Sequence, residues 1–200
     1  DFAKFALDLS KKHTLAIVVG GGKTARNAIE SCRKNGANEA ACDYAGIEAS
    51  RFNASAISQA MGIEPLIPDT IKEAKQVLET EGIVIMGGTE PGHSTDAVAA
   101  ILAEYINAEL YMKISNVDGI YDSDPKENPY AKRLDKLSID ELSRMVDGIS
   151  QEAGNYRLFD MLAVKMLKRS GIRTIVLEGH DFDNIQAAIS KKKFVGTIIE

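Results

Sequence analysis

Short apolar runs alternate along the chain with longer segments of helical periodicity. The apolar runs are rich in β-branched residues and predict strands at 14–19, 83–86, 110–115, 173–177 and 196–199, with a weaker candidate near 64–67. Apolar residues recur every three or four positions in the segments predicted to be helices, which are 1–12, 23–35, 45–61, 69–80, 94–106, 138–147, 158–170 and 182–190. This alternation predicts an α/β fold with a mainly parallel sheet that helices cover on both faces.

Two glycine-rich turns stand where a predicted strand is followed by a predicted helix. The turn at 20–24 (Gly-Gly-Gly-Lys-Thr) follows the first strand, and the turn at 87–95 (Gly-Gly-Thr-Glu-Pro-Gly-His-Ser-Thr) follows the strand at 83–86. Glycine lets the backbone approach a ligand closely, and the next helix directs free N–H groups and a positive dipole end at it. Such turns bind anions, phosphates above all. Two of them suggest two phosphorylated ligands and a transfer between them.

Neither turn is a Walker A motif or a dinucleotide fingerprint. Residues 22–24 (Gly-Lys-Thr) match the end of the Walker A motif, but Ile17 stands at its opening position. The spacing of 87–92 is right, but His93 replaces the lysine, and a neutral imidazole cannot do the work of an ammonium at the β and γ phosphates. The G-x-G-x-x-G pattern fails because Ala25 stands at its last position.

Composition and charge narrow the class of protein. The chain has 200 residues, of which 44% are hydrophobic and 26% charged, and these values are typical of one globular domain. The net charge of −5 argues against a nucleic-acid surface, and no run of 18 apolar residues predicts a membrane span. Cys32 and Cys42 have no metal-binding spacing. We therefore expect reduced thiols in a cytoplasmic protein without a protein-held metal site.

The loop after the predicted strand at 110–115 is a third candidate for ligand binding. It offers an aromatic ring, polar groups and carboxylates, from Ser115, Asn116, Asp118, Tyr121, Asp122 and Asp124. An adenine ring favours a flat apolar surface, and ribose hydroxyls need an acceptor. Taken alone, the loop is explained at least as well as a ligand-free turn rich in Asp, Asn, Gly and Pro. The stretch 116–134 is too polar and too rich in proline to be expected in the core.

Three motifs together resemble the amino acid kinase superfamily and, within it, the archaeal-type UMP kinases. They lie at 18–23 (VVGGGK), 86–97 (MGGTEPGHSTDA) and 116–125 (NVDGIYDSDP), and the middle one discriminates best. The resemblance runs from about residue 1 to the end of the chain. It implies transfer of the γ-phosphoryl group of ATP to UMP, giving UDP and ADP in pyrimidine nucleotide biosynthesis, with Mg²⁺ held mainly by phosphates and water. It also implies a homohexamer whose ligands are UMP and ATP, with no nucleic acid or membrane partner.

The same resemblance implies a fold and a role for each site residue. The fold is a three-layer αβα sandwich in one domain, in which 1–110 mainly bind UMP and 111–200 mainly bind ATP. Arg26 and Asp96 are the implied catalytic residues; without the resemblance they would be a helix-surface arginine and a first-turn carboxylate. The implied UMP contacts are Gly21, Asp43, Thr89, Glu90, Pro91, Gly92, His93, Ser94 and Thr95, with Asp43 on the ribose hydroxyls. The implied ATP contacts are Gly22, Arg26, Ser115, Asn116, Tyr121 and Asp124.

Two segments depart from the family pattern. Family members begin with a strand and a glycine turn at the ATP phosphates, and nothing in 1–13 can play that part. We therefore expect the natural protein to carry roughly 20 more residues ahead of Asp1, which supply this strand and turn. Residues 154–157 depart from the small residues expected before a helix that contains Asp160 and Lys165, so we assign those two no role.

Two other functions remain open from the sequence. One is another kinase of the same fold, with a carboxylate, carbamate or isoprenoid phosphate as acceptor. The other is a nucleotide-binding module that has kept the fold and lost catalysis. The middle motif and Asp43 distinguish a UMP kinase from the first alternative, because an acyl acceptor needs no partner for a ribose. Turnover with UMP distinguishes it from the second alternative.

Overall fold

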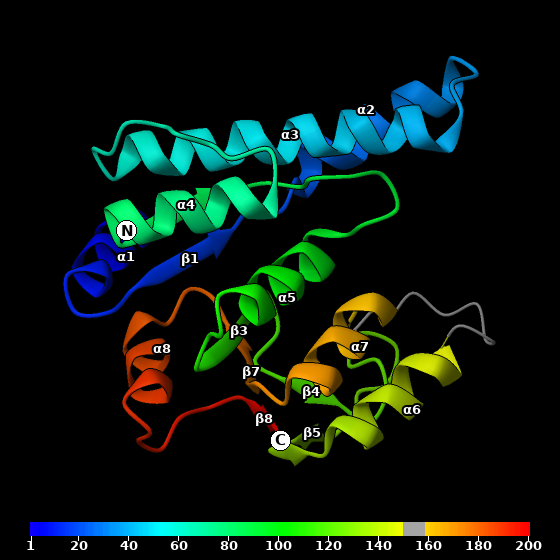
Figure 1. The fold of residues 1–200 in the computed structure, drawn as a ribbon. Helices are drawn as coiled ribbons and strands as arrows, with labels where there is room; N and C mark the ends of the chain where they lie inside the picture. The colour runs from blue at the N-terminus through cyan, green and yellow to red at the C-terminus, as the bar shows by residue number, and fades with distance from the viewer. Residues whose placement is uncertain (150–158) are drawn as a thin grey trace. The chain divides into compact units, whose positions relative to one another are not determined.

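The computed structural model describes residues 1–149 and 159–200, apart from the side chains of 148 and 149. Residues 154–157 lie outside this part. The chain divides into two compact units, Asp1–Ile106 and Asn107–Glu200, each with its own strands and helices (Figure 1). No helix of the described residues combines the length and the apolar character that a membrane crossing requires.

The first unit places two parallel strands between two layers of helices. Its elements are α1 (Phe2–Ser10), β1 (Leu15–Val18), α2 (Gly22–Lys34), α3 (Glu39–Ala60), α4 (Ile71–Glu81), β2 (Ile83–Met86) and α5 (Thr95–Tyr105). β1 and β2 pair along their full length. One core cluster joins them to α4 and α5, and a second joins their other face to α1 and α3. α2 packs along α3 (Figure 1).

The alternation of side chains along β2 explains these layers. Val84 and Met86 belong to the cluster with α4 and α5, whereas Ile85 belongs to the cluster with α1 and α3, against which Ile83 also packs. Successive side chains of a strand point to opposite faces of the sheet. A strand that is covered on both faces therefore needs an unbroken apolar run, which is the pattern at 83–86.

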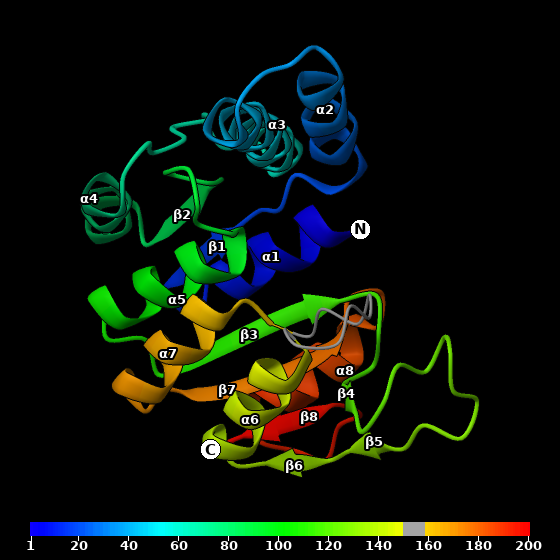
Figure 2. The ribbon, with the colours of Figure 1, turned by 90° about the vertical axis from the view of Figure 1, so that its right-hand side faces the viewer.

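The second unit contains a four-stranded mixed sheet and a small hairpin-like pair. Its elements are β3 (Leu110–Ser115), β4 (Ile120–Tyr121), β5 (Arg133–Leu134), β6 (Lys136–Leu137), α6 (Ile139–Ile149), α7 (Met161–Ser170), β7 (Arg173–Glu178), α8 (Phe182–Ile189) and β8 (Thr197–Ile199). The sheet order is β3-β7-β8-β6, and β4 pairs with β5. α6 and α7 lie on one side of β7 and β8, and α8 lies on the other (Figures 1 and 2).

The predicted alternation of strands and helices is present in both units, and three local expectations were wrong. The segment 64–67 forms no strand, since Pro65 and Pro68 cannot donate to a ladder. α3 begins at Glu39 instead of residue 45, because the Asn38 side chain accepts the Ala41 N–H and caps the helix. The pairing is mainly parallel, as expected, and β7 and β8 pair antiparallel within the larger sheet.

The stretch 116–134 also differs from the expectation that it lies outside the core. It contributes two short strands, and Ile120 in the first of them is only 1% exposed. Part of the loop is therefore core. The segment is rich in Asp, Asn and Pro, so its overall composition does not indicate that Ile120 is buried.

Candidate functional site

β1 leads directly into the first glycine turn, in which α2 begins. Gly21 is the N-cap of α2, and its carbonyl accepts the Ala25 N–H at 3.0 Å. A Cβ on Gly21 would lie 2.2 Å from the Ala25 Cβ, and Gly22 has a φ of +57°. Both positions therefore require glycine. Among the described residues no side chain caps α2, and its first turn has no acidic residue, so the chemistry of this helix end suits an anion.

The second glycine turn follows β2 and packs tightly against α3. A Cβ on Gly87 would lie 2.6 Å from the backbone nitrogen of Arg51 and 2.7 Å from the Ser50 Oγ. The Gly88 N–H donates to the same Ser50 Oγ at 2.8 Å. At the tip of the turn, Gly92 has a φ of +79° and donates its N–H to the Asp43 Oδ2 at 2.9 Å. Close backbone packing thus fixes the course of this turn.

α5 begins where the second turn ends. The Ser94 Oγ caps it by accepting the Ala97 N–H at 3.1 Å, and Asp96 lies in its first turn. A Cβ on Gly20 would lie 3.5 Å from the Thr95 Oγ1, so the start of α5 reaches the first glycine turn. Thr89 is buried, whereas Glu90 and His93 are exposed.

α3 holds both glycine turns through side chains that the sequence did not single out. The Asn53 amide donates to the Gly20 carbonyl at 2.9 Å, in the first turn. In the second turn the Arg51 Nε donates to the Gly88 carbonyl at 3.0 Å. Arg51 also forms an ion pair with Asp69 at 2.8 Å. One helix therefore sets the spacing of the two turns. In the sequence, these supporting contacts could be detected only as polar residues on the side of α3 that packs against the turns.

The structure brings together most of the residues of the first unit that the resemblance assigns to UMP binding. Gly21 packs against α3, where Asp43 lies on the second helical turn and contacts the turn at 87–95. Arg26 lies one turn into α2, as expected, and its side chain is exposed. The Asp43 carboxylate thus lies against one of two backbone turns at the carboxyl ends of parallel strands, where ligands bind in α/β folds, and Arg26 stands on the helix that begins in the other turn.

In the second unit, β3 ends at the expected third loop. The Ser115 carbonyl accepts the Gly179 N–H at 3.0 Å, which joins the ends of β3 and β7. The Ser115 Oγ lies 3.4 Å from the Asn116 Oδ1. Further along, the Asp124 Oδ1 accepts the Lys126 N–H at 2.8 Å. Asp124 therefore uses one carboxylate oxygen to hold its own turn, whatever its second oxygen binds.

Tyr121 is anchored at its phenol oxygen. Its O–H donates to the Asp118 Oδ1 at 2.7 Å, and the Arg133 Nη1 donates to the Asp118 Oδ2 at 2.8 Å. Burial raises the pKa of the Asp118 carboxyl, but the hydrogen bonds from Tyr121 and Arg133 outweigh it, and the net pKa lies below the ordinary value. The carboxylate is therefore ionised near neutral pH.

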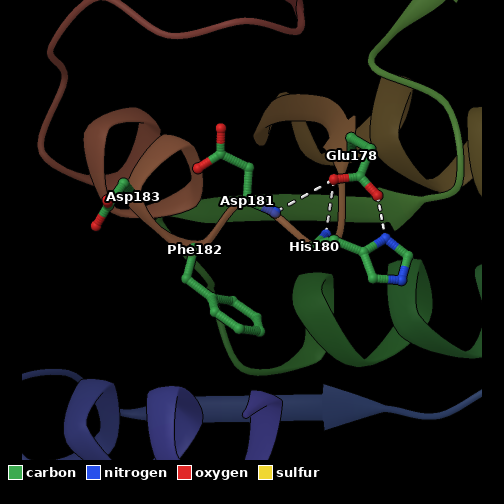
Figure 3. A pocket seen from close by; sticks show the side chains of 5 residues that line it. All are labelled: Glu178, His180, Asp181, Phe182 and Asp183. Carbon is green, nitrogen blue, oxygen red and sulfur yellow. Dashed lines mark hydrogen bonds and ion pairs between the residues drawn. The ribbon is translucent and has the colours of Figure 1, made fainter.

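An open hollow of about 500 Å³ lies at the end of β7, lined by Glu178, His180, Asp181, Phe182 and Asp183. Figure 3 shows the side chains of Glu178 and His180 facing each other while Asp183 points away. The Glu178 carboxylate accepts the His180 N–H at 2.7 Å and the Asp181 N–H at 3.2 Å, and it pairs with the His180 ring. That ring contact and then the backbone donors lower the pKa of Glu178. The sequence motifs gave no sign of this hollow.

The match to known proteins covers nearly the whole chain. The model of the amino acid kinase family matches residues 1–178. The uridylate kinase of Methanobrevibacter smithii is 41% identical, with 98% of this chain and 88% of that protein covered. The uridylate kinase of Methanocaldococcus jannaschii is 45% identical over 94% of this chain and 83% of its own length.

Solved structures agree with the sequence match. The crystal structure of uridylate kinase from Archaeoglobus fulgidus has a TM-score of 0.88 and 40% identity, and the match covers 100% of this chain and 90% of that chain. The UMP kinase of Ureaplasma parvum shares the fold at a TM-score of 0.77 and 23% identity, with 100% and 87% of the two chains covered. The resemblance drawn from the three motifs and the α/β fold predicted from the pattern are confirmed. The chain belongs to the amino acid kinase family.

Proposed function

We propose that this chain is a uridylate kinase, which transfers the γ-phosphoryl group of ATP to UMP and gives UDP and ADP. The observation that carries the proposal is the convergence of two glycine turns and the Asp43 carboxylate on α3. Relatives that bear the name uridylate kinase support it at 41% and 45% identity. Backbone N–H groups suit a phosphate, and a carboxylate beside them suits the hydroxyls of a ribose.

We assign the acceptor to the first unit. The UMP phosphate binds the backbone of the first glycine turn at Gly21. The turn from Thr89 to Thr95 wraps the nucleotide, and Asp43 accepts from the ribose hydroxyls. The contact between Asp43 and the Gly92 N–H supports this arrangement, because it holds the carboxylate against the turn that carries the other proposed contacts.

We assign the donor to the loop that leaves β3. Ser115, Asn116, Tyr121 and Asp124 bind ATP there, with Gly22 and Arg26 on its phosphates. Phosphoryl transfer needs positioning and neutralisation of charge more than covalent chemistry from the protein. Arg26 supplies a forked donor for phosphate oxygens, and Asp96 organises the surrounding cations and donors.

We propose that Mg²⁺ binds together with ATP. In the described residues, no three His, Cys, Asp or Glu side chains are grouped so as to hold a metal ion. Such a group is not required, because Mg²⁺ keeps several waters and commonly binds through substrate phosphates and one or two carboxylates. The ion supplies charge neutralisation at the phosphates. We also propose a homohexamer in the cytoplasm, and the free thiols of Cys32 and Cys42 are consistent with that compartment.

The test is an acceptor panel in a coupled assay of ADP release. UMP, CMP, dUMP, glutamate, carbamate and an isoprenoid phosphate are each offered with ATP and Mg²⁺. We expect the highest kcat/KM with UMP, and a loss of about 5- to 150-fold with dUMP, because Asp43 then lacks a hydroxyl partner. A carboxylate or carbamate that exceeds UMP would replace the assignment with another kinase of this fold. Nucleotide binding without ADP release on any acceptor would show a non-catalytic module.

A further inference from the structure

The side chains that hold Tyr121 form a connected network at the base of the third loop. Tyr121 and Arg133 are paired across β4 and β5, and both bond to Asp118. The two oxygens of Asp118 are divided between them, one for each partner. Arg133 is 26% exposed and Asp118 38% exposed, so the network is partly shielded from water.

Arg133 also fixes the backbone between its two partners. Gly119 has a φ of +152°, and a Cβ there would lie 2.7 Å from the Arg133 Cδ and 2.7 Å from the Thr197 Oγ1. The Arg133 side chain therefore packs directly against the loop backbone at Gly119, at a residue where only glycine fits. Arg133 further pairs with Asp135 at 3.0 Å, which restricts its rotamer from the other side.

Thr197 ties the same hairpin to the sheet. Its buried Oγ1 accepts the Ile120 N–H at 2.8 Å and donates to the Leu134 carbonyl at 2.6 Å. Figure 2 shows β4 and β5 beside β8, the strand that begins at this threonine. The backbones of both hairpin strands are thus fixed to the sheet, and the remaining freedom of Tyr121 is the orientation of its ring.

We propose that Arg133 and Asp118 are positioning residues that hold the Tyr121 ring as a stacking surface for the purine base of ATP. This inference rests on the proposed function, and specifically on ATP binding at this loop. Because the phenol O–H is donated to Asp118, Tyr121 presents its ring to the base and uses its hydroxyl to hold that ring still. An aromatic ring fixed in this way loses less conformational freedom when a base stacks on it.

The first measurement separates donor from acceptor effects. Arg133→Met removes the cation and keeps the length of the side chain. We expect it to raise the KM for ATP about tenfold and to leave the KM for UMP within about twofold, as expected for a lost charged hydrogen bond that orients a ligand contact. Arg133→Lys keeps the positive charge but lacks the forked N–H donors of the guanidinium, so its KM for ATP should lie between those of wild type and Arg133→Met.

The matched control is Lys168→Met. Lys168 also pairs with an aspartate of the second unit, Asp140, at 2.7 Å, but on the exposed surfaces of α7 and α6. Its loss should leave both KM values unchanged. A thermal melt of each variant shows that it is folded before its kinetics are compared.

The second measurement tests whether Arg133 acts through Tyr121. Tyr121→Phe keeps the ring and removes its anchor, so it should raise the KM for ATP less than Tyr121→Ala. In the Tyr121→Phe background, Arg133→Met should add little, because the contact that it orients is already gone. Additive effects of the two changes, or an equal rise in both KM values, would overturn the inference and leave Arg133 a structural residue. A wild-type chain without UMP phosphorylation would instead refute the proposed function.

Discussion

Replacing Ser50 by alanine removes one of the contacts through which α3 holds the second glycine turn. Ser50 is 1% exposed, and its Oγ accepts the buried Gly88 N–H at 2.8 Å and donates to the Ile47 carbonyl at 2.6 Å. In the variant the Gly88 N–H has no acceptor and little access to water, whereas the Ile47 carbonyl keeps its place in the helix. An unpaired buried donor costs about 1–3 kcal/mol. A chain of this size loses about 2–4 °C in Tm per kcal/mol, so the melt should fall by roughly 2–12 °C.

The assay combines that melt with steady-state kinetics. Because Gly88 lies in the turn that we assign to UMP, Ser50→Ala should raise the KM for UMP about tenfold and leave the KM for ATP unchanged. Ser58→Ala is the matched control. Ser58 is buried on the same helix, but its Oγ donates to the Ile63 carbonyl at 3.2 Å, far along the chain from either turn. It should lower Tm without changing either KM. Equal effects of both variants on the KM for UMP, or a lower Tm with unchanged UMP kinetics in Ser50→Ala, would refute the reasoning.

Three further predictions concern individual side chains. Asp43→Asn should raise the KM for UMP and narrow the preference for UMP over dUMP, and an unchanged KM would show that Asp43 does not contact the acceptor. Arg26→Ala should lower kcat on the order of 10²-fold with a smaller effect on nucleotide binding. A raised KM with an unchanged kcat would instead show that Arg26 binds the ground state and the transition state equally. The pKa of Asp118 is lowered in the folded state, so its contribution to stability is present above the ordinary value of 3.8 and is lost as the pH falls through the folded pKa. The gap in Tm between wild type and Asp118→Asn should therefore be constant above the ordinary value of 3.8 and shrink as the pH is lowered below it, and a gap that stays constant or widens in acid would contradict this expectation.

The two glycine turns could be predicted from the sequence because their requirement is local. Gly21 and Gly87 are positions at which any Cβ would collide with a neighbouring backbone or side chain, and only glycine satisfies them. The apolar runs of β1 and β2 are equally local signals, since a strand that helices cover on both faces has no polar position. The family motifs contain these same residues, which explains why the resemblance and the pattern agree.

The residues that support the turns could not be predicted, because their partners are distant in sequence. Arg51 bonds to Gly88, which is 37 residues away, and Asn53 bonds to Gly20, which is 33 residues away. On a helix, polar residues of this kind ordinarily face water. Only the packing of α3 over the strand ends turns them toward the backbone of a site.

Short elements were missed for a different reason. β4, β5 and β6 have two residues each, too few to establish a period of two. Their stability comes from contacts outside the pairing, among them the Thr197 hydroxyl between Ile120 and Leu134. The false strand at 64–67 is the converse case, in which local composition suggested pairing and the prolines at 65 and 68 prevented it.

The most direct test of the central claim is a crystal structure of this chain with UMP bound. We expect the UMP phosphate to lie against the backbone of the first glycine turn, at Gly21. We also expect the ribose hydroxyls to lie within hydrogen-bonding distance of the Asp43 carboxylate. UMP bound instead at the loop that contains Tyr121, or in the first unit without contact to Asp43, would contradict the assignment of the acceptor site.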